Sequence, residues 1–255
     1  MKILAIVNQK GGVGKSMLAA SLSGALTELK RKVLVVDMDA QASLSGMLAK
    51  RPEAIKQTMF HVLVDEVEIS DIVQPSKMDY LWLVPSSKAM KGLELKLASD
   101  PLDAIYLLRD ALNDITDDFD IVLIDTPPKL DLATRMALVA ADGIIIPIEC
   151  QRFAFEATSA MLNEIQTVKK RVNPELKMLG FVINKFSATR KVEQMYNQAL
   201  RQKYKELVFK TEFRNNVQYT EACTLGLPIT HAYPRSSQAQ TVRNFITELN
   251  SAIAA

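Results

Sequence analysis

The feature that most constrains this chain is a glycine-rich segment near its start, residues 8–16, which reads Asn-Gln-Lys-Gly-Gly-Val-Gly-Lys-Ser. A short apolar run, Ile3–Val7, precedes it and has the composition of a buried strand. After it, apolar residues recur at helical spacing from Leu18 to Leu29. A glycine turn that joins a buried strand to a helix is the setting in which a loop can wrap a phosphate group. The segment therefore predicts an α/β fold with an anion site at the end of the first strand.

The residue types in this loop indicate the kind of anion. Its three glycines let the backbone approach a polyphosphate closely, so that successive N–H groups point at the phosphate oxygens. In such a loop Lys15 reaches the β- and γ-phosphates, and the Ser16 hydroxyl binds Mg²⁺. The strict pattern requires glycine at position 9, where this chain has Gln9, and a second lysine, Lys10, opens the glycine run instead. The loop therefore predicts a nucleotide site of an unusual type.

Two further strand-like runs end in aspartates. Val33–Val36 leads into Asp37 and Asp39, and Ile121–Ile124 leads into Asp125. The carboxyl ends of parallel strands form the edge at which open α/β sheets bind ligands. Asp37 and Asp39 are two residues apart, so their side chains share a face if strand geometry persists. A carboxylate at a strand tip, such as Asp125, is typical of a group that holds Mg²⁺ through a water molecule.

The rest of the chain alternates strands and helices. Strand-like runs occur at residues 80–85, 143–148, 179–184 and 207–209, and helical patterns separate most of them. Residues 93–112 indicate two helices broken by Pro101, with Asp100 as the cap of the second. This alternation predicts a mainly parallel, twisted sheet with helices on both faces. Because no repeat, low-complexity tract or linker interrupts it, we expect residues 1–255 to form a single domain.

Composition excludes several classes of protein. No apolar run approaches the ~20 residues that span a bilayer, and the start of the chain is too short in apolar residues for a signal peptide. The chain has two cysteines and two histidines, too few for a disulfide framework or a histidine metal site. Residues 1–150 carry 16 Lys and Arg against 21 Asp and Glu, whereas residues 151–255 carry 15 against 8. The basic second part indicates either an anionic partner or a solvated surface.

The chain resembles the ParA/MinD family of ATPases, whose phosphate loop deviates from the strict pattern in the same way. The resemblance covers nearly the whole chain, and its motifs are Lys10–Ser16, Asp37–Gln41, Asp125–Pro128, Phe153–Glu156, Arg214–Asn216 and Thr220–Ile229. It implies a P-loop fold that binds ATP and Mg²⁺ and hydrolyses ATP slowly on its own.

The resemblance also implies roles for individual residues. Lys10 reaches across a dimer interface to the partner's nucleotide, Asp39 orients the attacking water, and Asp37 stands near the hydrated Mg²⁺ that Ser16 and Asp125 hold. The residues implied to contact the nucleotide at the loop are Lys10, Gly11, Gly12, Val13, Gly14, Lys15, Ser16 and Met17. Asn184, at the tip of a later strand, either contacts the adenine edge or serves only as a turn residue.

Partners and location follow from the same resemblance. Members of the family form a homodimer around two ATP molecules, bind DNA without sequence preference in that state, and respond to a cargo-bound stimulating partner, which is ParB-like or a cargo adaptor. Arg214, and after it Arg190, match DNA-contact positions, and Lys203, Lys205 and Lys210 would extend that surface. Plain surface charge explains the other residues equally well, whereas for Arg214 we favour DNA contact. We expect a cytoplasmic, nucleoid-associated protein without a membrane partner and without an amino-terminal helix-turn-helix.

Two residues differ from the family pattern, and three alternative functions are considered. Met17 replaces a hydroxyl residue of many relatives, and Ala40 replaces a proline beside Asp39. A MinD-like, membrane-associated ATPase that acts at the cell-division site is the main alternative, but the tail has no cation after Arg243 to support a basic membrane helix. A metal-cluster carrier would need paired ligand cysteines, and Cys150 and Cys223 lack that spacing. A nucleotide-gated adaptor would differ only in lacking turnover.

Overall fold

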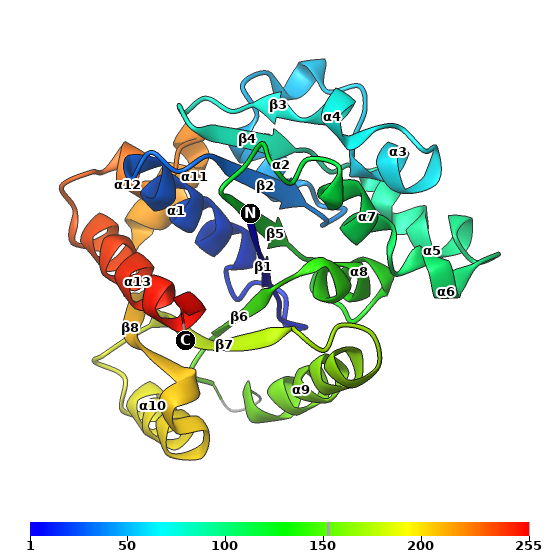
Figure 1. Cartoon of the computed structure of the whole chain (residues 1–255). Helices are drawn as coiled ribbons and strands as arrows, with labels where there is room; N and C mark the ends of the chain where they lie inside the picture. Colours follow the sequence, from blue (N-terminus) through cyan, green and yellow to red (C-terminus); the bar gives the residue numbers. More distant parts are fainter. Residues whose placement is uncertain (152–153, 255) are drawn as a thin grey trace.

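One mostly parallel sheet organises the molecule (Figure 1). The computed structural model of the chain describes residues 1–151 and 154–254. The strands are β1 (Lys2–Ile6), β2 (Val33–Asp37), β3 (Gln74–Pro75), β4 (Leu81–Val84), β5 (Ile121–Asp125), β6 (Gly143–Ile148), β7 (Lys177–Phe186) and β8 (Val208–Arg214). Their order in the sheet is β3-β4-β2-β5-β1-β6-β7-β8. β3 runs antiparallel to β4, whereas the other described pairs are parallel.

Helices cover both faces of the sheet, as predicted. The helices are α1 (Lys15–Glu28), α2 (Ser43–Leu48), α3 (Met59–Val64), α4 (Ile69–Ile72), α5 (Leu93–Lys96), α6 (Pro101–Ala104), α7 (Leu107–Asn113), α8 (Leu132–Ala140), α9 (Ala154–Arg171), α10 (Lys191–Tyr204), α11 (Val217–Leu225), α12 (Ile229–Ala232) and α13 (Ser237–Ala254). In Figure 1, α1, α11, α12 and α13 group on one face, and α7, α8 and α9 lie on the other.

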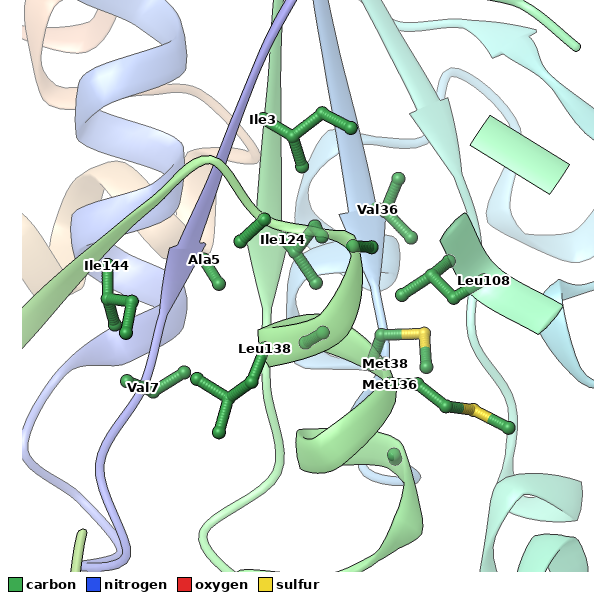
Figure 2. Packing of buried hydrophobic residues seen from close by; sticks show 14 of the residues in the cluster. Ile3, Ala5, Val7, Val36, Met38, Leu108, Ile124, Met136, Leu138 and Ile144 are labelled. Carbon is green, nitrogen blue, oxygen red and sulfur yellow. The ribbon is translucent and has the colours of Figure 1, made fainter. Parts of the chain in front are cut away.

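Strand β1 shows how the sequence divides the core into two layers. Ile3, Ala5 and Val7 belong to the hydrophobic cluster under α7, α8 and α9, while Leu4 and Ile6 belong to the cluster under α1 and α13. This alternation is the period of two that a strand imposes on its side chains. Figure 2 shows the first cluster, in which Ile3, Ala5 and Val7 lie along one side of the strand. A strand buried on both faces explains the unbroken apolar run that precedes the glycine loop.

Three local predictions differ from the structure. The pattern between residues 93 and 112 yields three short helices, α5, α6 and α7, rather than two, because Pro101 begins α6 and the chain turns again before Leu107. Asp100 caps α6, as predicted, by accepting a hydrogen bond from the Asp103 N–H at 3.2 Å. The last strand, predicted at residues 207–209, runs on to Arg214, and the short strand β3 was not predicted.

No helix of the described ranges combines the length and apolar character needed to cross a membrane.

Candidate functional site

The glycine loop lies at the carboxyl end of β1 and leads directly into α1. Gly12 and Gly14 have φ angles of 77° and 88°, a left-handed conformation that side chains disfavour. Gly14 is also closely packed, because a Cβ atom built on it would lie 2.4 Å from Nδ2 of Asn184. The loop therefore requires glycine at position 12 for backbone shape alone, and at position 14 for both backbone shape and space.

A backbone carbonyl of β6 and two side chains of β7 hold this loop from outside. Asn8 Nδ2 donates to the Pro147 carbonyl at 2.6 Å, and Asn184 Nδ2 donates to the Val13 carbonyl at 2.7 Å. Lys185 Nζ donates to the Gly12 carbonyl. Two loop carbonyls are thus held by β7, while no described residue accepts a hydrogen bond from the N–H groups of residues 11–14. Unpartnered N–H groups beside a helix amino terminus are suited to bind an anion.

Lys15 sits at the centre of this anion site. It is only 7% exposed, and burial lowers the pKa of its ammonium group, an effect that the nearby charges of Asp125 and Asp39 oppose. A buried cation that faces two carboxylates and a set of free N–H groups indicates that an anionic ligand belongs in the same space. The contact of Lys15 with the β- and γ-phosphates stays a prediction.

Asp37 and Asp125 are neighbours on adjacent strands, since β2 and β5 pair Asp37 with Asp125. Both are fully buried, and neither oxygen of Asp125 has a hydrogen-bond partner among the described residues. Burial raises the pKa of Asp125 well above its usual value; the charge of Asp37 raises it further, and the Ser16 hydroxyl and Lys15 oppose the shift. Burial likewise raises the pKa of Asp37, to about 6.

The structure separates the roles of these two carboxylates. Asp37 Oδ2 accepts hydrogen bonds from the Ser45 N–H at 2.9 Å and the Ser45 hydroxyl at 2.7 Å, and Asp37 Oδ1 accepts from the Asp39 N–H at 3.0 Å. Asp37 therefore anchors the loop that carries Asp39. Asp125 has both oxygens available for a ligand, so of the two it is better suited to a hydrated cation.

These residues fit a hydrated Mg²⁺ ion. The unpaired Asp125 oxygens and the Ser16 hydroxyl would hold the ion's waters and one of its coordination positions, with phosphate oxygens supplying others. No group of three or more His, Cys, Asp and Glu side chains suited to a metal occurs among the described residues. A site made of one hydroxyl, one strand-tip carboxylate and the substrate's own phosphates is the type that Mg²⁺ accepts in phosphoryl-transfer proteins.

Asp39 lies at the wall of an open cleft next to this site. The cleft has a volume of about 460 Å³, and Pro127 and Pro128, which follow β5, also line it. Asp39 is partly exposed and accepts a hydrogen bond from the Gln41 N–H at 2.9 Å. The loop after β2 and the loop after β5 thus line the same cleft.

A second pocket, of about 210 Å³, opens on the other side of the glycine loop. Gly14, Met17, Asn184 and Cys223 line it, and Arg214 lies at the same pocket. Asn184 is only 1% exposed and its amide is engaged by the Val13 carbonyl, so its contact with an adenine edge stays a prediction. The pocket adjoins the glycine loop, because Gly14 and Met17 are among its lining residues.

The two arginines predicted to contact DNA, Arg214 and Arg190, have different surroundings. Arg214 also lines a polar groove with Lys210 and the start of α13, whereas Arg190 lies at the amino end of α10 and pairs with Glu193 at 3.0 Å. The family segment Phe153–Glu156 lies outside the residues whose side chains are described. The DNA roles of Arg214 and Arg190 therefore stay predictions.

Sequence reasoning missed three residues of this region: Ser45, Lys185 and Glu149. Glu149 accepts a hydrogen bond from Lys10 Nζ at 2.6 Å, although 139 positions separate the two residues. Its place directly after β6 is the one signal that could have drawn attention to it, since strand ends gather at this edge. Lys185 carries the same signal, because it directly follows the strand predicted at residues 179–184, whereas Ser45 carries none.

Comparisons with known proteins agree with the geometry. A family model described as an AAA domain matches residues 1–178. The chain is 31% identical to the sporulation initiation inhibitor protein Soj of Bacillus subtilis, over 97% of this chain and 98% of that protein. It is 32% identical to the chromosome-partitioning ATPase Soj of Thermus thermophilus, over 96% of this chain and 94% of that protein.

A solved structure shares the fold as well. Cobyrinic acid a,c-diamide synthase from Mycobacterium smegmatis, with a bound ATP analogue and magnesium, superposes with a TM-score of 0.84 at 29% identity, covering 97% of this chain and 93% of that one. The sheet with helices on both faces, the deviant glycine loop and the length of these matches lead to one assignment. The chain belongs to the ParA/MinD-type family of P-loop ATPases.

Proposed function

We propose that this chain is a partition-type ATPase that binds Mg²⁺–ATP and dimerises with a second copy of itself around the nucleotides. The dimer binds DNA and releases it after ATP hydrolysis. The observation that carries the nucleotide part is the buried, unpartnered Asp125 beside Lys15, at a loop whose N–H groups lack acceptors. Similarity to the Soj proteins, which are named for chromosome partitioning and sporulation control, supports the partition part.

Each of the predicted site residues then has a defined role. The loop N–H groups and Lys15 bind the phosphates, and Ser16 and Asp125 hold the cation, which when bound screens the phosphate charge. Asp39 orients a water molecule in line with the terminal phosphate, while Asp37 fixes the loop that carries Asp39. Lys10 of the second copy adds positive charge between the β- and γ-phosphates in the transition state.

A cargo-bound partner protein would complete the cycle by speeding hydrolysis. Bound ATP then stabilises the dimer, and its hydrolysis separates the two copies and releases DNA. Slow hydrolysis by the chain alone follows from this design, because fast turnover would abolish the dimer.

The membrane-associated alternative finds less support in the fold. Helix α13 directs its apolar side chains into the core, where Val242, Phe245 and Leu249 are at most 1% exposed. Those residues are not free to enter lipid while the helix stays docked. We therefore favour a DNA-associated role over a membrane-associated one.

Thiol protection offers a direct test of the nucleotide site. Cys223 lines the pocket beside Gly14, whereas Cys150 is 2% exposed and serves as the internal control. Burial raises the pKa of the Cys223 thiol, so alkylation is best followed by mass spectrometry at mildly alkaline pH. Saturating Mg²⁺–ATP should slow alkylation of Cys223 several-fold, and Lys15→Ala should remove the protection. Alkylation that ATP does not change would count against this site.

A further inference from the structure

Glu149 occupies a position at the phosphate loop that the proposed function leaves without a role. It follows β6 directly, and its side chain is 11% exposed. One carboxylate oxygen accepts a hydrogen bond from Lys10 Nζ at 2.6 Å, and the other lies 3.7 Å from Lys185 Nζ. One nearly buried carboxylate thus faces two lysines.

Both lysines belong to the rim of the anion site. Lys10 opens the glycine run, and its Nζ also contacts Gln151 Oε1 at 2.7 Å. Lys185 follows Asn184 at β7, donates to the Gly12 carbonyl, and lines the pocket beside Gly14. Both lysines at the rim of the loop are therefore held by Glu149 and by neutral oxygens.

The three side chains differ in their freedom to move. The side chains of Lys10 and Lys185 are 36% and 45% exposed, whereas Glu149 is nearly covered. Lysine has a long, flexible stem and loses its contacts readily, but a buried carboxylate at a strand end keeps its place. The lysines can therefore exchange partners, while Glu149 stays in position as the competing anion.

We propose that Glu149 is a positioning residue that holds Lys10 and Lys185 in the nucleotide-free chain and releases them to an incoming polyphosphate. Nucleotide binding then exchanges one carboxylate partner for phosphate oxygens, and Lys185 becomes a further nucleotide-binding residue. This inference rests on the proposed nucleotide function and adds to it a residue that lowers affinity by competition.

The direction in which Glu149→Gln changes nucleotide affinity distinguishes a carboxylate that competes with the nucleotide from one that only supports the loop. Glu149→Gln keeps the size of the side chain and removes its charge, so the affinity of the chain for a fluorescent ATP analogue with Mg²⁺ should rise roughly three- to ten-fold, as expected for losing partly exposed ion pairs. Glu149→Asp keeps the charge and should stay within about two-fold of the parent chain. If Glu149 only braced the loop, Glu149→Gln would bind the analogue more weakly; weaker or unchanged affinity overturns the inference.

A matched control and a second variant complete the test. Glu28 pairs with Arg243 at 2.7 Å on the far end of α1, and Glu28→Gln should leave the affinity unchanged. Lys185→Met should weaken binding and reduce its salt dependence, and unchanged binding would remove Lys185 from the nucleotide site. Lys15→Ala keeps the two proposals apart: if it abolishes binding while Glu149→Gln changes nothing, the nucleotide site stands and the competition by Glu149 fails.

Discussion

At the scale of single residues, Asp37 and Asp125 carry the same charge in neighbouring positions but have opposite surroundings. Three hydrogen bonds from Ser45 and Asp39 satisfy Asp37, whereas both oxygens of Asp125 lack a partner. A buried, unsatisfied carboxylate destabilises the folded state of the free chain. Asp125 is therefore kept at the expense of stability, which is the pattern expected of a residue that awaits a ligand.

Neutralising Asp125 should stabilise the free protein. Burial raises the pKa of Asp125 in the folded chain above its unfolded value, so its contribution to stability is full below the unfolded pKa and is lost as pH rises through the folded pKa. Asp125→Asn should thus raise the free energy of unfolding near pH 8 by roughly 1–3 kcal/mol, with a smaller difference near pH 5. Calorimetry at both pH values measures this difference.

Asp37→Asn is the matched control, because it alters a carboxylate that is already hydrogen-bonded. The introduced amide would have one acceptor oxygen in place of two, so this substitution should lower the free energy of unfolding by roughly 1–3 kcal/mol. Asp125→Asn should also lose the rise in melting temperature that Mg²⁺–ATP gives the parent chain. An Asp125→Asn protein less stable than the parent at pH 8 would contradict the assigned surroundings of Asp125.

At the scale of elements, the loop after β2 is anchored by a short chain of hydrogen bonds. The Ser45 hydroxyl, on α2, donates to Asp37 and accepts from the Ser86 N–H at 2.8 Å, just beyond β4. The ends of β2 and β4 and the start of α2 are thus joined at one buried hydroxyl. The position of Asp39 depends on this junction, since Asp39 N–H bonds to the same carboxylate.

Ser45→Ala should separate hydrolysis from binding. Loss of the hydroxyl leaves the buried Ser86 N–H without its acceptor and loosens the loop that carries Asp39, so phosphate release should slow several-fold while nucleotide affinity changes little. Ser23→Ala on α1 is the control, because Ser23 is equally buried but bonds only the Ala20 carbonyl of its own helix. Equal phosphate release by the Ser45→Ala and parent proteins would show that Ser45 does not position Asp39.

Elements with strong local patterns could be predicted from sequence, and contacts between distant segments could not. Strand β1, the glycine loop and α1 follow from apolar period and glycine spacing, and the strand ends at Asp37 and Asp125 follow from the same logic. Strand β3 has two residues, too few to show a period. The pairing of Lys10 with Glu149 depends on β6 lying beside β1, and strand order is not written in any local pattern.

At the scale of the whole molecule, the uneven charge of the chain is the basis for the proposed DNA surface. Basic residues exceed acidic ones after residue 150, and Arg214 and Lys210 share a groove of about 340 Å³ with the start of α13. Contacts from such residues to phosphates give affinity without sequence preference. Arg214 also lines the nucleotide-side pocket, so a DNA test must check nucleotide binding in parallel.

Arg214→Ala should weaken ATP-dependent binding to duplex DNA for every sequence tested and lower the slope of log affinity against log salt by about one. Arg109→Ala, which removes a half-buried arginine from α7, is the matched control and should change neither quantity. A salt titration in a fluorescence anisotropy assay measures both. Retention of the full slope by Arg214→Ala would place the DNA contacts elsewhere on the chain.

The central claim is that nucleotide is enclosed between two copies of this chain and that each lends Lys10 to the other. Multi-angle light scattering of the Asp39→Ala protein with saturating Mg²⁺–ATP tests it most directly, because this variant should keep ATP while hydrolysing it poorly. We expect the mass of two chains with ATP, one chain with ADP, and one chain when Lys10→Ala is added. A single-chain mass in saturating ATP, or a two-chain mass that survives Lys10→Ala, would contradict it.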